Sequence, residues 1–429
     1  MNYKKLRGYI FPNVFAMVGV SLYILADTFF ISASAGANGL TALNLVLPLY
    51  SLIFAVGAML GNGTATAFSL EKSLPGNDAD AYFSHSVMAN LIVSIPFVFS
   101  GILLPEALMA FFGADDFIIE IGRIYVRTFL IFTPFFLLNS TFTAFVRNDG
   151  NPNVAMAATL ISSLFNVVFD YILMFPCGLG MFGAALATGI APAVGIAVTF
   201  IHFFSAKNTI HFRFLLPSVR KIARACRLGI GYFVSEISGG ISGFVFNKIL
   251  LGLSGNVAVA AYGIVANISV VGTAIFSGVA QGLQPMASEA QAAEDTQARK
   301  AICRYSLKTG ILISAAMLLL LCAFAREVVA IFNSEHNAQM ASLAVSNLRL
   351  YVLGFLPASA NIILCGYFGA IGRDRLCSVI SISRGVVAIV LFAWILSGLF
   401  GIVGVWIAYP VTEIVTLITA LMLIRKNGI

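Results

Sequence analysis

Charged residues are scarce in this sequence. Only 10% of its 429 residues are Asp, Glu, Lys or Arg, whereas a soluble domain has about 25%. Hydrophobic residues make up 59% of the chain. This balance excludes an ordinary soluble domain, and we conclude that the chain is an integral membrane protein.

The sequence also lacks the side-chain patterns of catalysis. No His, Cys or Ser stands with a base and an orienting group, no spacing suits a metal-ligand cluster, and no GxxxxGK[ST] nucleotide loop is present. The six cysteines are scattered without a CxxC pair, so we interpret them as small packing residues. We therefore expect no enzyme activity and no cofactor, and any energy must come from an ion gradient.

What the chain does have is a series of apolar runs about 20 residues long, the length that crosses a bilayer. Asp27 interrupts the first run, which is too long for a secretory signal despite the small residues Ala33-Ser34-Ala35 behind it. We place twelve spans, at residues 10–32, 40–62, 84–106, 120–145, 153–175, 182–204, 227–251, 257–281, 302–324, 346–371, 377–398 and 402–424. The expected fold is an all-α membrane protein with twelve transmembrane helices.

Lysine and arginine are distributed unevenly between the two ends of these spans. With the amino terminus inside, the inner segments hold 19 of the 25 basic residues, the outer ends hold five, and Arg384 lies within a span. Because positive charge favours the cytoplasmic side, both termini are predicted to be cytoplasmic. This bias explains the net charge of +7, which therefore does not indicate a nucleic-acid partner.

The two halves of the chain repeat one another. GMFGAALA at 180–187 is matched 221 residues later by GIVGVWIA at 401–408, and the second span with its loop recurs at an offset of 219. We therefore predict two pseudo-symmetric six-helix lobes, residues 1–206 and 227–429, joined by a basic cytoplasmic linker, 207–226. Six crossings bring the chain back to the same side, so both lobes run in the same sense, an arrangement used by secondary transporters.

Charged side chains deep in a span cost at least about 2.5 to 3.5 kcal/mol to insert, so each is a functional hypothesis. The sequence has five: Asp27, Asp170, Glu236, Arg384 and Glu413. Asp27 and Asp170 each precede a predicted outer turn by nine residues, and Thr188 follows one by nine. At 1.5 Å per residue, all three lie about 13 to 14 Å below the outer turns.

Asn166 lies one helical turn from Asp170 and on the same face. Two carboxylates, an amide and a hydroxyl at one depth suit a hard cation such as Na⁺, or a shared proton. The alternative is that Asn166 and Asp170 only hydrogen-bond neighbouring helices. We favour an ion or proton site at Asp27, Asn166, Asp170 and Thr188, because such packing contacts do not need a second carboxylate at the same depth.

The remaining deep charges lie in the second half. Glu236 is either a second ionisable site or a polar contact between helices, and Glu413 and Arg384 are predicted to form an ion pair that holds this lobe together. Arg147 and Arg373 are repeat-related and end inner helices. We predict that both anchor in the membrane interface by snorkelling, with a gate contact at the inner mouth as the alternative.

Five motifs, in their order and spacing, resemble the multidrug and toxic compound extrusion (MATE) transporters over nearly the whole chain. They are LADTFFIS at 25–32, RNDGNPNVAM at 147–156, NVVFD at 166–170, GMFGAALAT at 180–188 and GIVGVWIAYP at 401–410. The resemblance implies a bacterial inner-membrane antiporter that exports cationic, amphipathic compounds by alternating access as Na⁺ or H⁺ enters. It also implies that Asp27, Asn166, Asp170 and Thr188 form the family's amino-terminal-lobe cation site.

Family members that use a carboxylate resembling Glu236 pair it with an acid on the tenth helix, and residues 345–372 hold no acid. This favours the amino-terminal lobe as the ion site.

A flippase for lipid-linked saccharides, from the same wider superfamily, is the alternative function. The spans contain four deep acids and one deep base, and this balance disfavours an anionic substrate, though not a zwitterionic one. A channel or a scaffold is the third reading. We expect contact with membrane lipid, a small-molecule substrate and a monomer.

Overall fold

The computed structural model describes residues 3–72, 79–332 and 338–426, which are almost entirely helical. Residues 1–2 and 73–78 of the first predicted lobe, and 333–337 and 427–429 of the second, lie outside the described residues. The helices are α1 (Tyr3–Glu71), α2 (Asp80–Leu103), α3 (Pro105–Phe111), α4 (Asp116–Ile131), α5 (Thr133–Asn148), α6 (Pro152–Met174), α7 (Gly180–Phe203), α8 (Val219–Ala292), α9 (Thr296–Ala323), α10 (Ala325–Phe332), α11 (Ala338–Tyr351), η1 (Val352–Gly354), α12 (Phe355–Ala370), α13 (Asp374–Ile382), η2 (Ser383–Val387) and α14 (Ala388–Lys426).

Each of the twelve predicted spans is helical in this structure, although some consist of more than one helix. Ten helices of the described chain are long and apolar enough to cross a membrane, and α4 with α5, bent by 45°, makes an eleventh. Pro134 at the start of α5 has no N–H to continue the helical ladder, which explains that bend. The last helix, Asp374–Arg425, breaks at Gly401 and so contains the final two spans. The prediction of an all-α membrane fold is confirmed.

Part of the predicted linker is helical. Ser218 caps α8, and its Oγ accepts a hydrogen bond from the backbone N of Lys221 at 3.5 Å. A capped helix start satisfies a backbone donor that would otherwise lie free. Residues 219–226 of the predicted linker therefore form the first two turns of α8.

The duplication is visible in the backbone. Gly36 and Gly255, 219 residues apart, break α1 and α8 with φ of 61° and 67°. Gly180 and Gly401, 221 residues apart, take φ of 49° and 57°. Residues with a Cβ pay roughly 1 to 2 kcal/mol for this left-handed conformation. Glycine is therefore required at both pairs of positions, with the same offsets that the sequence repeat shows.

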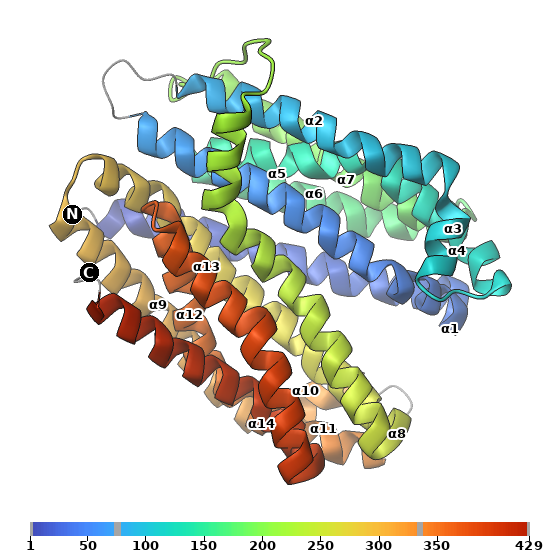
Figure 1. Cartoon of the computed structure of the whole chain (residues 1–429). Helices are drawn as coiled ribbons and strands as arrows, with labels where there is room; N and C mark the ends of the chain where they lie inside the picture. The colour runs from blue at the N-terminus through green and yellow to red at the C-terminus, as the bar shows by residue number, and fades with distance from the viewer. Residues whose placement is uncertain (1–2, 73–78, 333–337, 427–429) are drawn as a thin grey trace.

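The two lobes meet at one end and diverge toward the other. Both termini lie at the same end in Figure 1, which we call the inner end because it is the predicted cytoplasmic side. The amino-terminal helices α2, α5, α6 and α7 lie in the upper part of that view, and α9, α12, α13 and α14 lie in the lower part. Leu6, Tyr9 and Ile10 of α1 are buried in a hydrophobic cluster whose other buried members belong to the second lobe. Core packing therefore joins the lobes at the inner end.

Repeat-related glycines let the two backbones touch there. Gly63 of α1 lies against the carbonyl of Ala225 in α8, and its repeat partner Gly282 of α8 lies against Ile10 of α1. A Cβ added at Gly282 would lie 2.6 Å from the Cα of Ile10, too close for any real contact. Backbone contact of this kind leaves no passage, so the inner end is closed.

Asp149 fixes the connection between the lobes. It follows α5 and is buried, with His202 Nε2 at 2.9 Å and Lys72 Nζ at 2.5 Å. Thr209, in the segment after α7, donates to it from its backbone N at 2.7 Å and from Oγ1 at 2.5 Å. Burial alone would raise the pKa of the Asp149 carboxyl, but the bonds from His202, Lys72 and Thr209 outweigh it and lower the pKa below its ordinary value of 3.8.

Asp149→Asn is expected to lower the free energy of unfolding by at least about 2 kcal/mol at neutral pH, because charged hydrogen bonds are lost. The pKa of the Asp149 carboxyl is lower in the folded protein than in the unfolded chain. Its stabilisation is therefore complete at any pH above the pKa of the unfolded chain, and it disappears as the pH falls through the pKa of the folded protein. Thermal unfolding in detergent should therefore show a constant deficit from neutral pH down to about pH 5, shrinking below about pH 4. Glu120→Gln, on an exposed residue, is the control. A deficit that grows with acidification would contradict this account.

Candidate ion and substrate site

Asp27 and Asp170 come together in the amino-terminal lobe. Asp27 lies on the first limb of α1 and is 9% exposed, and Asp170 lies near the end of α6 and is 0% exposed. Their carboxyl groups are close enough to interact electrostatically. The two acids therefore meet, as their predicted equal depth requires.

Asn166 and Thr188 lie beside this pair. Asn166 Nδ2 donates a hydrogen bond to Thr188 Oγ1 at 3.1 Å, and both side chains are buried. Asn166 is one turn from Asp170 on the buried face of α6. The four residues predicted from the sequence come from α1, α6 and α7, and we call them the Asp27–Asp170 cluster.

Four enclosed oxygen atoms of this cluster have no hydrogen-bond donor among the described residues. They are Asp27 Oδ1, Asn166 Oδ1 and both carboxylate oxygens of Asp170. Each buried polar atom left unpaired costs about 1 to 3 kcal/mol. A small cation bound through oxygen ligands, or a proton shared by the acids, would remove that cost. The donor set therefore fits the ion or proton site that the sequence predicts.

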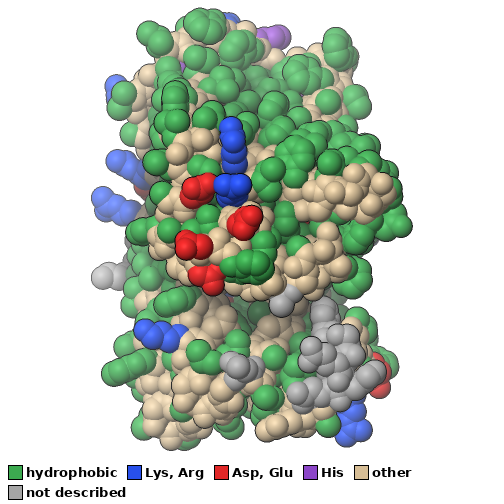
Figure 2. Space-filling model, turned by 90° about the vertical axis from the view of Figure 1, so that its right-hand side faces the viewer, with side chains coloured by type: hydrophobic (Ala, Val, Ile, Leu, Met, Phe, Trp, Pro, Cys, Tyr) green, Lys and Arg blue, Asp and Glu red, His purple; other side chains and the backbone are tan. Residues whose placement is uncertain are grey.

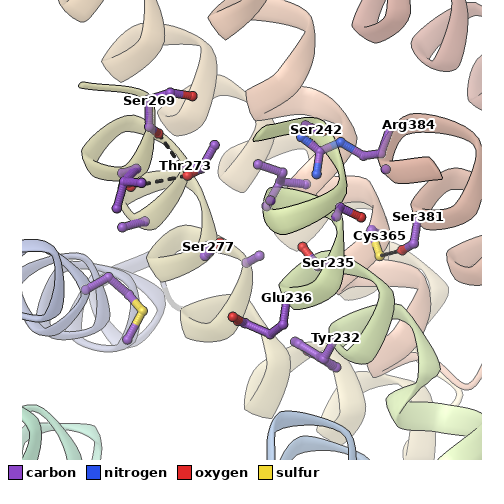
Figure 3. Close-up of a pocket in the computed structure, with 18 of the residues that line it drawn as sticks. Tyr232, Ser235, Glu236, Ser242, Ser269, Thr273, Ser277, Cys365, Ser381 and Arg384 are labelled. Atoms are coloured by element: carbon purple, nitrogen blue, oxygen red, sulfur yellow. Dashed lines mark hydrogen bonds between the residues drawn. The ribbon is translucent and has the colours of Figure 1, made fainter. Parts of the chain in front are cut away.

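A cavity of about 430 Å³ lies between the first limb of α1 and the carboxyl-terminal lobe (Figure 3). Met17, Ser21 and Ile24 form part of its wall on α1. Asp27 lies three residues beyond Ile24, and residues at this spacing share one face of a helix. The Asp27–Asp170 cluster and the cavity are therefore neighbours along the same face of α1.

Hydroxyl groups line the opposite wall. They belong to Ser235, Ser238, Ser242, Ser269, Thr273, Ser277 and Ser381. Glu236 lies among them on α8, and its side chain faces the cavity (Figure 3). It is exposed, and it makes no hydrogen bond or ion pair with any residue in the described part of the chain. Glu236 thus does not form the polar helix contact that was one of its two predicted roles.

The predicted ion pair between Arg384 and Glu413 is confirmed. Arg384 Nη2 lies 2.6 Å from Glu413 Oε1, and Arg384 Nε lies 3.1 Å from the same atom. Asn361 Nδ2 also donates to Glu413 Oε2, at 2.8 Å. This pair joins η2, α12 and α14, and it lies in the wall of the cavity.

Arg147 does not snorkel, and that prediction was wrong. Its side chain is buried at the inner end, where both terminal nitrogens donate to amide oxygens. Nη1 lies 2.8 Å from Gln281 Oε1 and 3.3 Å from Asn13 Oδ1, and Nη2 lies 2.7 Å from Asn62 Oδ1 and 3.3 Å from Gln284 Oε1. Gln281 and Gln284 belong to the other lobe, so Arg147 fits the gate contact we held as the alternative. Arg373 is exposed at the surface.

A group of charged side chains marks the outer end of the amino-terminal lobe. Figure 2 views that end and shows acidic and basic side chains gathered within a mostly hydrophobic and uncharged face. The exposed acids of α3, α4 and the turn between them are Glu106, Asp115, Asp116 and Glu120, against Arg123 and Arg127. Arg123 Nη1 pairs with Glu106 at 3.0 Å. On the second lobe the described outer end also exposes Lys248, Arg326, Glu327 and Arg349, so this end as a whole has no surplus of acid.

Sequence reasoning missed the amide side chains around Arg147 and the role of Asp149. Neutral residues were weighed only beside the deep acids, as Asn166 and Thr188 were, whereas Asn13, Asn62, Gln281 and Gln284 lie elsewhere in the spans. The signal that was available was an amide in an apolar run, which is costly to bury without a partner. Asp149 lies in the RNDGN motif itself, directly after a span.

Comparison with known proteins agrees with this architecture. A family model, MatE, matches residues 12–172 and 233–417. The multidrug export protein MepA of Staphylococcus saprophyticus is 25% identical over 97% of this chain and 93% of its own length. MepA of Staphylococcus haemolyticus is also 25% identical, over 98% of this chain and 93% of its own.

A solved structure described as the outward-facing conformation of a multidrug resistance MATE family transporter superposes with a TM-score of 0.92. It is 25% identical, and the match covers 99% of this chain and 95% of that one. The matched fold has the two lobes and the helix order described above. Since the family match also covers most of the sequence, we conclude that the chain belongs to the MatE family, the multidrug and toxic compound extrusion family that its motifs resemble.

Proposed function

We propose that this protein is a secondary active antiporter that exports cationic, amphipathic compounds as Na⁺ or H⁺ enters at the Asp27–Asp170 cluster. The observation that carries this proposal is the set of four buried oxygen atoms without a donor, beside a cavity on the same face of α1. The relatives named multidrug export protein MepA support efflux of several compounds.

Coupling follows from the shared helix. Tyr23, next to the cavity-lining Ile24 and four residues before Asp27, lies within electrostatic reach of Asp27, Asp170 and Glu236. A cation or proton at the cluster removes negative charge near the cavity, and a cationic substrate then binds there less tightly. Ion entry and substrate release thus favour each other, which is the linkage an antiporter needs.

The closed inner end and the cavity beyond it suit alternating access. In this arrangement the substrate would leave toward the outer end, and the lobes would then rock about the cavity to open the inner end. We place both termini in the cytoplasm, because 19 of 25 basic residues belong to inner segments. The bacterial relatives and the family resemblance support placing the protein in a bacterial inner membrane. One chain holds both the ion cluster and the cavity, so a monomer suffices.

Transport of ethidium by the wild-type protein in proteoliposomes tests the proposal. A sodium gradient and a proton gradient are imposed separately, and dye movement is followed by fluorescence. One gradient is expected to drive ethidium uphill, which identifies the coupling ion, and a matched potassium gradient is the control. If neither gradient moves ethidium, the antiporter assignment fails, and a lipid-flipping assay in the same vesicles then tests the flippase alternative.

A further inference from the structure

A second pocket lies at the start of α8, away from the cavity described above. Glu71 at the end of α1 and Tyr82 at the start of α2 form one side of it, and the first turns of α8 form the other. Among the described residues of its wall, Glu71 is the one acid, and four residues are basic: Arg220, Lys221, Arg224 and Arg227. The pocket therefore has an excess of positive charge at the inner end.

Three of the basic side chains lie on one face of α8. Arg220, Arg224 and Arg227 are spaced i, i+4 and i+7, and residues three or four apart are neighbours on a helix surface. Like charges at this spacing destabilise the helix. Negative partners, from the protein or from a ligand, therefore stabilise this face.

Acids of the described chain pair with two of these arginines. Arg224 pairs with Glu71 across the pocket. Arg227 Nε lies 3.6 Å from Asp374 Oδ2, and the Arg227 side chain is 77% exposed. Arg220 is exposed and makes no hydrogen bond or ion pair with any residue that the structure describes. One guanidinium in the wall of the pocket, with its five N–H groups, is therefore available to an anionic ligand.

Exposed apolar side chains come directly before this face. Phe214, Leu216 and Val219 lie within the six residues that precede Arg220, and they are 81%, 83% and 84% exposed. We call these three residues the apolar patch. A segment that exposes large apolar groups beside basic ones is typical of the membrane interface, where acyl chains meet phosphate headgroups.

The segment that carries the apolar patch is fixed to the first lobe. The backbone N of Arg213 donates to Ser84 Oγ at 2.8 Å, and the backbone N of Ser218 donates to His85 Nδ1 at 3.4 Å. Both acceptors belong to the first two turns of α2. Ser218 also lines the pocket. The apolar patch is therefore held in place beside the pocket.

We propose that this pocket binds the phosphate of an anionic phospholipid from the leaflet at the inner end, with the acyl chains along the apolar patch. Arg220 donates to the phosphate oxygens, and its planar fork can make two parallel bonds to them. Basic pockets beside membrane helices on the cytoplasmic side bind anionic headgroups. A zwitterionic headgroup lacks the net charge, and free phosphate has no acyl chain for the apolar patch. The inference does not depend on the antiport mechanism proposed above.

Binding of defined ligands to the purified full-length protein tests this inference. The protein is held in a nonionic detergent, and a short-chain phosphatidylglycerol, the matching phosphatidylcholine and inorganic phosphate are titrated separately. Microscale thermophoresis gives the affinity for each. Phosphatidylglycerol is expected to bind at least about tenfold more tightly than either of the others, because it alone has both the net charge and the acyl chains.

Arg220→Gln is expected to weaken phosphatidylglycerol binding by about tenfold, because bonds from a charged donor to the phosphate are lost. Replacing both Phe214 and Leu216 by serine should weaken phosphatidylglycerol and leave inorganic phosphate unchanged. Lys300→Gln removes one positive charge from an exposed position of α9 at the same end and is the matched control. Thermal unfolding reports whether each variant is folded.

Several results would overturn the inference. One is that the wild type binds phosphatidylglycerol no more tightly than phosphatidylcholine, or does not bind it. Another is that Arg220→Gln or the double serine variant, when folded, binds phosphatidylglycerol as the wild type does. Inorganic phosphate bound as tightly as phosphatidylglycerol would show a simple anion site without lipid. None of these readouts involves ethidium transport, so a failure here leaves the antiporter assignment in place.

Discussion

Asp170→Asn is expected to abolish ion-driven export while making the protein more stable. Asp170 is 0% exposed, and neither of its carboxylate oxygens has a donor among the described residues. An amide cannot hold a cation or carry a proton as a carboxylate does, so transport should fall by at least about 100-fold. Removing an unpaired buried acid should at the same time raise the free energy of unfolding by about 1 to 3 kcal/mol.

The opposite signs of these two effects separate function from packing. If Asp170 merely held helices together, its replacement would lower stability and reduce transport only in proportion to the folded fraction. Ethidium export in proteoliposomes and thermal unfolding in detergent give the two readouts on the same preparations. Asp27→Asn should behave in the same way, because both acids share the cluster. Glu120→Gln on the outer face is the control that should change neither.

Arg147→Gln should open the inner end. Two of the four hydrogen bonds from Arg147 reach Gln281 and Gln284 in the other lobe. Bonds from a charged donor contribute about 1.5 to 3 kcal/mol each, so the closed state should lose about 3 to 6 kcal/mol. A shift of about 5.5 kcal/mol takes a two-state population from 99:1 to 1:99. Most molecules should therefore leave the closed state, and export should slow by at least about tenfold.

Spin labels on the two lobes measure this change. Lys207, four residues after the end of α7 of the first lobe, and Lys300, on α9 of the second lobe, are exposed at the inner end. Each can be replaced by a labelled cysteine in a background without the six native cysteines. Pulsed electron resonance should show longer distances in Arg147→Gln than in the unmutated background. Arg373→Gln, at the exposed repeat-related arginine, is the matched control. An unchanged distance distribution in Arg147→Gln would show that glycine packing alone closes the inner end.

Local properties of the chain made much of this protein predictable. Apolar runs fix where helices cross a bilayer, because no other segment can satisfy its backbone there. The constant rise of a helix then gives depth, and depth alone placed Asp27 level with Asp170 before any contact was known. Arg384 and Glu413 were paired for a similar reason, since a buried charge requires an opposite one.

Contacts between the lobes could not be predicted from these local properties of the chain. The sequence by itself determined the spans, the duplication, the uneven placement of basic residues and the four residues of the Asp27–Asp170 cluster. Only the tertiary structure decided that Arg147 bridges the lobes, that Glu236 and Arg384 share one cavity, and that the inner end is closed. Those outcomes depend on which helix faces meet when two lobes dock, and docking brings together residues more than 130 positions apart, such as Arg147 and Gln281. Helix periodicity determines which residues share a face of one helix, but it does not determine which other helix packs against that face.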